Sequence, residues 1–270
     1  TGDKYDLRPF SNGPYKISSY KIGDQLELER NAAWKKSSDT VRTPYPDNIV
    51  VRFGLSEDVR DQIMLEDQIP NTASLDSLQP ANLRAFFADP TKKAQRFNVY
   101  DPYVRYAAFN VKKVPCLEIR RAVYFAKDAA GLLQLSGGAA FGGDPADGAI
   151  KPLMGLDYKK VTGLEDYKPA GNAEAAMALM AKAKTTCPAE YARATDPKRG
   201  LVFDTADSET NKKGAAIWID SMMKNAGIVM KFNFIEPGAY YTVVLDVTKQ
   251  SDLSAGGWAP DWANASTVIP

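Results

Sequence analysis

The order of apolar and polar residues predicts β-strands in the first part of the chain. Two runs that alternate with a period of two flank a polar Gly-Asp turn, which is the pattern of a β-hairpin. Ser56, followed by two acidic residues, is typical of a helix N-cap. The predicted elements are strands at 15–20, 26–30, 49–53, 97–99 and 105–109, and helices after Ser56 and after Pro80.

After Pro115 the apolar spacing becomes helical. A strand at 201–203, a helix with Gly227 at its end and a strand at 228–235 form a crossover unit, which implies a parallel pair of strands. This part is therefore expected to be an α/β lobe. Its other predicted elements are a helix from Ile119 that ends before Gly131, a surface loop at 136–148, a helix at 173–184, and a stripe of Ile219, Met222, Met223 and Ala226 on the crossover helix.

Charge and length exclude several classes of protein. The 270 residues include 34 basic and 33 acidic side chains, a net charge of +1, so no nucleic-acid partner is expected. No apolar run is long enough to span a bilayer. The loop at 136–148 contains neither of the glycine-rich phosphate-binding patterns, and no cofactor is predicted.

Histidine is absent, which removes imidazole-based nucleophilic catalysis and histidine metal ligation. Enzymes that use paired carboxylates remain open, and Asp204, Asp207 and Glu209 after the strand at 201–203 are the best candidates for a secreted hydrolase. Acidic residues after a strand more often form a solvated loop. The two cysteines, Cys116 and Cys187, leave two free thiols or one long-range disulfide equally open at this point.

Several phrases, in this order, resemble the extracytoplasmic solute-binding proteins of peptide-type ABC transporters (family 5). Each is weak alone, but together they extend over nearly the whole chain. The phrases are Asn-Gly-Pro-Tyr-Lys-Ile at 12–17, Leu-Glu-Leu-Glu-Arg-Asn at 26–31 with Trp34, Pro-Asp-Asn-Ile-Val at 46–50, Tyr-Ala-Ala-Phe-Asn-Val at 106–111, Ile-Arg-Arg-Ala-Val at 119–123, and Gly-Gly-Trp-Ala-Pro-Asp-Trp at 256–262.

The resemblance implies an α/β fold of the type II periplasmic-binding-protein kind, with two lobes that close on a ligand. Because members of this family are about twice as long, the chain is expected to be a fragment. Residues 1–110 are assigned to a mixed-sheet lobe, 111–257 to an α/β lobe, and 258–270 to a crossover back toward the first lobe.

The function that the resemblance implies is capture of a peptide or another amine-bearing solute, without catalysis, for an ABC transporter permease. The protein is expected to act as a monomer outside the cytoplasmic membrane, in a periplasm or on the cell surface, with lipid anchoring resting on the resemblance alone. A surface receptor or adhesin that keeps the fold is the other non-catalytic alternative. Binding of peptides without turnover would separate both from the hydrolase.

The resemblance also assigns ligand-binding residues. Gly257, Trp258 and Asp261 match a Gly-Trp-x-x-Asp motif whose aspartate anchors the ligand's ammonium, with Ala259 and Pro260 between them. The alternative for Asp261 is a cap on a helix that begins near residue 263. The stretch 245–255 contains no arginine and only Lys249 as a cation, so an amine-bearing ligand without a fixed carboxylate is favoured.

The extracytoplasmic setting that the resemblance implies favours oxidation of the cysteines. We therefore expect a disulfide between Cys116 and Cys187, which requires their Cα atoms to lie within about 7 Å of each other.

Overall fold

The computed structural model describes residues 9–101, 103–262 and 264–268. Contacts divide the chain into two compact units, 1–82 and 83–270. The whole chain is a mixed α/β structure with a separate sheet in each unit. No described helix combines the length and the hydropathy that crossing a bilayer demands.

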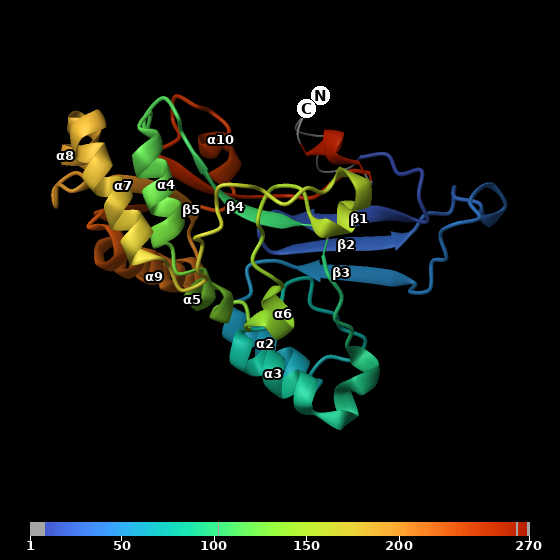
Figure 1. Ribbon diagram of the computed structural model, residues 1–270. Helices are drawn as coiled ribbons and strands as arrows, with labels where there is room; N and C mark the ends of the chain where they lie inside the picture. Colours follow the sequence, from blue (N-terminus) through green and yellow to red (C-terminus); the bar gives the residue numbers. More distant parts are fainter. Residues whose placement is uncertain (1–8, 102, 263, 269–270) are drawn as a thin grey trace. The chain divides into compact units, whose positions relative to one another are not determined.

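The first unit contains a three-stranded antiparallel sheet, β1–β2–β3 (Figure 1). The predicted hairpin is confirmed: the N–H of Asp24 donates to the carbonyl of Lys21 at 3.0 Å, and Gly23 adopts a positive φ of 74° in the turn. The register places Leu28 between Ile17 and Ile49, so one face of the sheet is apolar. The strands are β1 (Tyr15–Lys21), β2 (Gln25–Arg30) and β3 (Asn48–Arg52).

A helix and a buried carboxylate follow this sheet. Ser56 caps α2 (Glu57–Glu66) by accepting from the N–H of Val59, as the sequence predicts. Asp61 of α2 is 1% exposed and accepts from the N–H of Gln79 and from Asn82, which fixes the segment after the helix. The remaining elements are η1 (Lys36–Ser38) and α3 (Pro80–Ala88), which contains the division between the units.

The second unit is built on a four-stranded mixed sheet in the order β4-β7-β5-β6. β4 and β7 are antiparallel, whereas β5 is parallel to both β6 and β7. The predicted strand–helix–strand unit is confirmed, with Gly227 ending its helix at φ 65°. The strands are β4 (Val104–Phe109), β5 (Leu201–Ala206), β6 (Met230–Ile235) and β7 (Leu253–Trp258).

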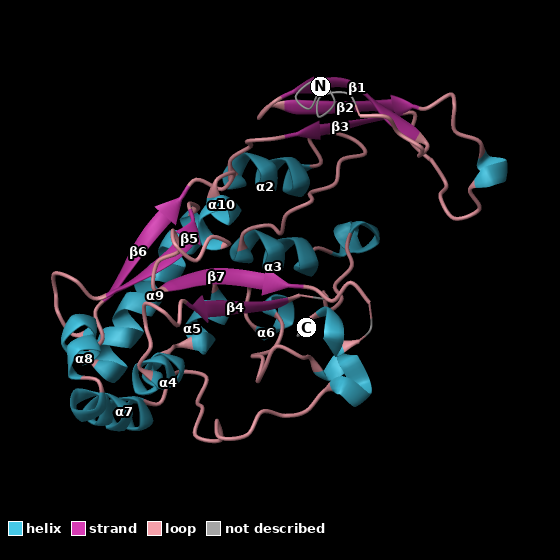
Figure 2. Cartoon of the chain, turned by 90° about the horizontal axis from the view of Figure 1, so that it is seen from above, coloured by secondary structure: helices cyan, strands magenta, loops and turns pink. Residues whose placement is uncertain are grey.

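Helices α4, α7 and α9 cover one face of this sheet (Figure 2). Ile119 of α4, Met180 of α7 and Met222 of α9 pack in one apolar core with Leu201, Leu253 and their neighbours. In the stripe predicted on α9, Met222 and Ala226 are buried, but Ile219 and Met223 remain about half exposed. The helices are η2 (Pro90–Gln95), α4 (Leu117–Ala126), α5 (Ala129–Gln134), α6 (Ala139–Gly142), η3 (Pro152–Asp157), α7 (Ala173–Thr186), α8 (Pro188–Ala194), α9 (Glu209–Ala226), α10 (Tyr240–Val244) and η4 (Ala265–Thr267).

Local details differ from the sequence-based expectations in two places, at residues 97–99 and within 136–148. Residues 97–99 form no strand; Phe97 and Val99 are exposed and the segment has no strand partner. The helix predicted from Ile119 is confirmed, since α4 ends at Ala126, before Gly131; a second helix follows, in which the Asp128 carboxylate accepts from the Gly131 N–H as a cap. The segment 136–148, expected to be loop, contains the short helix α6.

The division between the units falls at 82/83, whereas the sequence-based boundary between lobes was placed at residue 110. The difference comes from β4, whose hydrogen-bonding partner is β7 near the other end of the chain. No pattern local to residues 104–109 could indicate that pairing. The lobes of a whole two-lobed protein remain a prediction.

The disulfide between Cys116 and Cys187 is confirmed, with Cα atoms 6.1 Å apart. Cys116 stands at the N-cap of α4, and Cys187 joins the end of α7 to the start of α8. The bond therefore fastens α4 to the α7–α8 corner.

Candidate functional site

The candidate site lies at the end of β7, in the segment that carries the Gly-Trp-x-x-Asp motif. Asp252 fixes the beginning of the strand: its carboxylate accepts from Arg193 at 2.8 Å and from the Val202 N–H at 2.9 Å. Its carbonyl accepts from the N–H of Asn110 at 2.9 Å. The start of β7 is thus tied to α8, β5 and the end of β4, and this holds the motif at a defined place in the sheet.

β5 and β7 separate as they approach their carboxyl ends. They pair only at Phe203–Leu253 and Asp204–Ser254, after which β5 continues beside β6 and β7 beside β4. We call this opening the β5–β7 fork and define it by Thr205 and Ala206 on one side and residues 255–258 on the other. No described strand pairs with β7 inside the fork. Openings at the carboxyl ends of parallel strands are common ligand sites in α/β folds.

Tyr240 of α10 sits in the fork and is 6% exposed. Its hydroxyl lies within hydrogen-bonding distance of the carbonyls of Asp204 and Ala255, one on each strand. Burial, with a further contribution from the negative charge of Asp204, raises the pKa of Tyr240 to about 12. The hydroxyl therefore remains a neutral donor at physiological pH.

The position of Tyr240 shows which backbone groups of β7 face the fork. Because the Ala255 carbonyl points toward Tyr240, strand alternation directs the N–H and carbonyl of Gly257 to the same side. The backbone of Gly257 is therefore available at an unpaired strand edge. An extended chain placed there could add to the sheet as a further strand.

The motif continues into a tight loop closed by Thr267. The Trp258 indole N–H donates to the Thr267 carbonyl at 2.8 Å, and the Asp261 N–H donates to the Thr267 hydroxyl at 2.8 Å. The same hydroxyl donates to Asp261 Oδ2 at 3.1 Å. Thr267 is buried, so one residue holds both the indole and the carboxylate of the motif in place.

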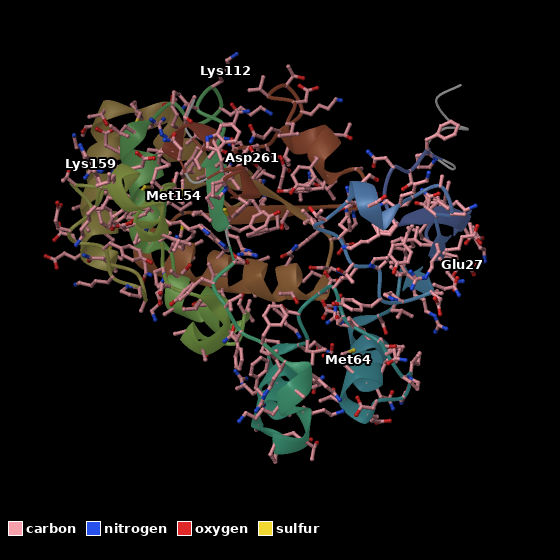
Figure 3. The ribbon with its side chains drawn as sticks, turned by 90° about the vertical axis from the view of Figure 1, so that its right-hand side faces the viewer. Glu27, Met64, Lys112, Met154, Lys159 and Asp261 are labelled. Carbon is pink, nitrogen blue, oxygen red and sulfur yellow. A yellow bond between two sulfur atoms is a disulfide. The ribbon has the colours of Figure 1, made fainter. Side chains whose placement is uncertain are left out.

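Asp261, labelled in Figure 3, is exposed. Its second oxygen, Oδ1, has no hydrogen-bond partner in the described part of the chain, and no described lysine or arginine forms an ion pair with it. Trp258 and Trp262 are 48% and 58% exposed. The arrangement leaves a fixed negative charge beside apolar surface, which favours a cationic group.

The alternative role for Asp261, as a helix cap, is not what the structure shows. The helix nearest to it, η4, begins at Ala265 and is capped by Asn264, which accepts from the Ser266 N–H at 2.9 Å. Residue 263, where that helix was expected to begin, lies outside the described residues. Ala259 and Pro260 are half-buried between the tryptophan and the aspartate.

The carboxylates considered for a hydrolase have structural partners. Asp204 is fully buried in β5, where its oxygens accept from Asn233 and from the backbone and hydroxyl of Ser251. Asp207 and Glu209 both form ion pairs with Lys212, at 2.9 and 3.1 Å. Asp204 thus organises the turn into β7 and does not face solvent.

No sequence pattern predicted a role in the site for Thr267, for Tyr240 or for Tyr106 of β4, whose ring lies over Gly256. Their importance depends on pairings between distant segments, which no local pattern reveals. The one signal in the sequence was the glycine doublet at 256–257, since adjacent glycines in a strand indicate close approach of another group.

The chain belongs to the bacterial extracellular solute-binding proteins of family 5: the model of the middle part of that family matches residues 1–270. No curated protein matches the chain. This membership confirms the resemblance found in the sequence.

Solved structures with the same fold include three oligopeptide-binding or peptide-binding proteins. The clavulanic acid biosynthesis oligopeptide binding protein 2 is 22% identical with a TM-score of 0.71, over 98% of this chain and 47% of that one. The Escherichia coli murein tripeptide binding protein MppA is 18% identical with a TM-score of 0.70, over 95% and 47%. Haemophilus influenzae OppA, solved with the peptide RPPGFSPFR, is 19% identical with a TM-score of 0.66, over 95% and 47%.

These likenesses establish the fold, which is that of the type II periplasmic binding proteins. The chain spans about half the length of the structures that it matches. Its family is one of solute-binding receptors.

Proposed function

We propose that this chain is part of an extracytoplasmic receptor that captures peptides, or related amine-bearing solutes, and delivers them to the permease of an ABC transporter. The observation that carries the proposal is the exposed Asp261 carboxylate, which Thr267 holds through one oxygen while the other stays uncommitted, close in sequence to an unpaired strand edge. The ligand's ammonium binds Asp261, and its backbone pairs with Gly257 inside the β5–β7 fork.

The chemistry of the motif supports an amine rather than a carboxylate as the recognised group. Lys249, the cation of the stretch before the motif, forms an ion pair with Asp246 at 3.4 Å. Pro260 has no N–H to donate to a ligand, so strand-like pairing ends before it. Gly257, Trp258 and Asp261 then supply the backbone edge, the apolar wall and the charge.

In this proposal the protein is a non-catalytic monomer outside the cytoplasmic membrane, with or without a lipid anchor, and the rest of the protein supplies the other side of the cleft. Closure around the ligand produces the form that the permease recognises. A receptor or adhesin role would use the same site without delivery of the ligand, and an uptake assay in a strain lacking the protein distinguishes the two.

The test is calorimetry on the full-length protein with wild type and Asp261→Asn. A short peptide with a free amino terminus should bind the variant roughly tenfold or more weakly, since a charge-assisted hydrogen bond is lost. The same peptide with an acetylated amino terminus is the matched control, and it should bind both proteins equally weakly. Equal affinity of the free-amine peptide for both proteins would overturn the proposal.

A further inference from the structure

Because residues 256 and 257 are glycines, β7 lacks two successive side chains, and Tyr106 of β4 occupies the space beside Gly256. In the register of the sheet, Tyr106 lies directly opposite Gly256. A Cβ atom on Gly256 would come within 2.6 Å of Tyr106 Cε2 and 3.0 Å of Cζ. The phenol ring therefore lies across the backbone of β7, in a position that the side chain of any residue other than glycine at 256 would block.

The ring lies on the face of the sheet opposite the apolar core. Ala107 and Ala255, the neighbours of Tyr106 and Gly256, pack against the core below α4 and α7. Because successive side chains point to opposite faces, Tyr106 points away from the core. It is 45% exposed.

From this position the ring reaches the β5–β7 fork. β4 is on one side of β7 and the fork is on the other, so a ring that extends from β4 over Gly256 is directed toward the fork. Trp258, two residues after Gly256, projects from the same face and is 48% exposed. Two aromatic side chains thus border the strand edge on this face.

A ligand strand that pairs with Gly257 would also alternate its side chains between the two faces of the sheet. A side chain on the face of Tyr106 would meet the ring of Tyr106 and the indole of Trp258. Asp261 is the charged residue of the motif itself, and in the proposed function the ligand's ammonium occupies it. The surface left for the side chain is aromatic and apolar.

We propose that Tyr106 is a specificity-determining residue that selects peptides with an aromatic side chain near the anchored amino terminus. This inference rests on the proposed function. Gly256 is the residue that permits the selection, because any larger side chain would displace the ring. Asp261 provides affinity for the amine common to all peptides, whereas Tyr106 distinguishes among their side chains.

The experiment measures, by calorimetry on the full-length protein, the affinities of trialanine and of three variants with one phenylalanine at position 1, 2 or 3. In wild type, the peptide with phenylalanine at position 1 or the one with phenylalanine at position 2 should bind more tightly than trialanine. The expected ratio is roughly three- to tenfold, the range of an aromatic pair. Tyr106→Ala should abolish that ratio while changing the affinity for trialanine by less than about twofold. Tyr106→Phe, the matched control, should keep it because the ring remains.

Gly256→Ala provides an independent check through the neighbouring strand. Its Cβ must push the Tyr106 ring aside, so the phenylalanine preference should fall as it does in Tyr106→Ala. A preference unchanged in both variants overturns the inference, as does a stronger preference for lysine than for phenylalanine at the same position.

Asp261→Asn in the same series separates this inference from the proposed function. If Asp261→Asn lowers the affinity for every peptide, but Tyr106→Ala leaves the ratio of phenylalanine-peptide to trialanine affinity unchanged, only the inference fails. If Asp261→Asn has no effect on any peptide, the proposed function fails, and the inference fails with it.

Discussion

The strands of the first unit carry no buried residue, whereas the sheet of the second unit buries Leu201, Phe203 and Leu253. The second unit encloses one apolar core between its sheet and three helices. In the first unit the most buried side chain described is Asp61, held by hydrogen bonds from Arg60, Gln79 and Asn82. One unit is stabilised chiefly by apolar burial, and the other depends on a buried polar cluster and leaves an apolar sheet face half open.

Replacing an isoleucine by alanine should therefore lower the free energy of unfolding more in the second unit than the same replacement does in the first. Ile119→Ala removes a fully buried side chain from the core of the second unit and should lower the free energy of unfolding by about 4 kcal/mol. Ile49→Ala, on the half-exposed face of the first sheet, should cost about 1 kcal/mol. Urea unfolding with hydrogen exchange read separately for peptides of each unit measures both, and equal costs would contradict the comparison.

Acid should affect the first unit through Asp61. Burial opposes ionisation of this carboxyl, but hydrogen bonds from Asn82, Gln79 and Arg60 outweigh it and lower its pKa below the ordinary value of 3.8. The stabilisation is therefore present above pH 3.8 and is lost as the pH falls through the lowered pKa. Hydrogen exchange in α2 should become faster over this range as that stabilisation is lost.

Asp61→Asn should remove most of that pH dependence while destabilising α2 at neutral pH. The matched control is Asp58→Asn in the same helix, where the carboxylate is exposed and accepts from the Gln79 side chain. A wild-type profile that resembles Asp61→Asn would rule out this role for Asp61.

Alkali should affect the second unit through Tyr240. Because its folded pKa is raised from 10.0 to about 12, its contribution is complete below pH 10 and is lost as the pH rises toward 12. Urea unfolding should show about 1 kcal/mol less stability at pH 11 than at pH 9 from this source. Tyr240→Phe should remove this part of the dependence, and Tyr241→Phe, the exposed neighbour, should not.

Local sequence patterns predicted the elements well where each residue's surroundings lie close in the chain. The period-two runs around Gly23 and the crossover ending at Gly227 are examples, because turn and cap preferences act over a few residues. The family motif located the candidate site at Asp261, whose role stays a prediction. The patterns failed at residues 97–99, where apolar residues without a partner strand remain exposed.

The supporting residues of the site could not be predicted for a different reason. Tyr106 lies beside Gly256 only because β4 and β7, almost 150 residues apart, pair in one register. Thr267 holds Asp261 and Trp258 through a hydroxyl and a carbonyl that have no distinctive sequence pattern. Their positions follow from the assembled sheet.

Cys116 and Cys187 are 71 positions apart in the sequence, and the bond between them makes this part of the chain a closed covalent ring. The ring includes α4 and α7 and, between them, α5, α6, η3 and irregular segments. A protease that cuts one peptide bond within the ring releases no fragment, so the cleaved protein keeps its mass on a non-reducing gel and separates into two pieces only after reduction. A single cut there would leave both sides of the cut attached to the sheet that carries the proposed binding site.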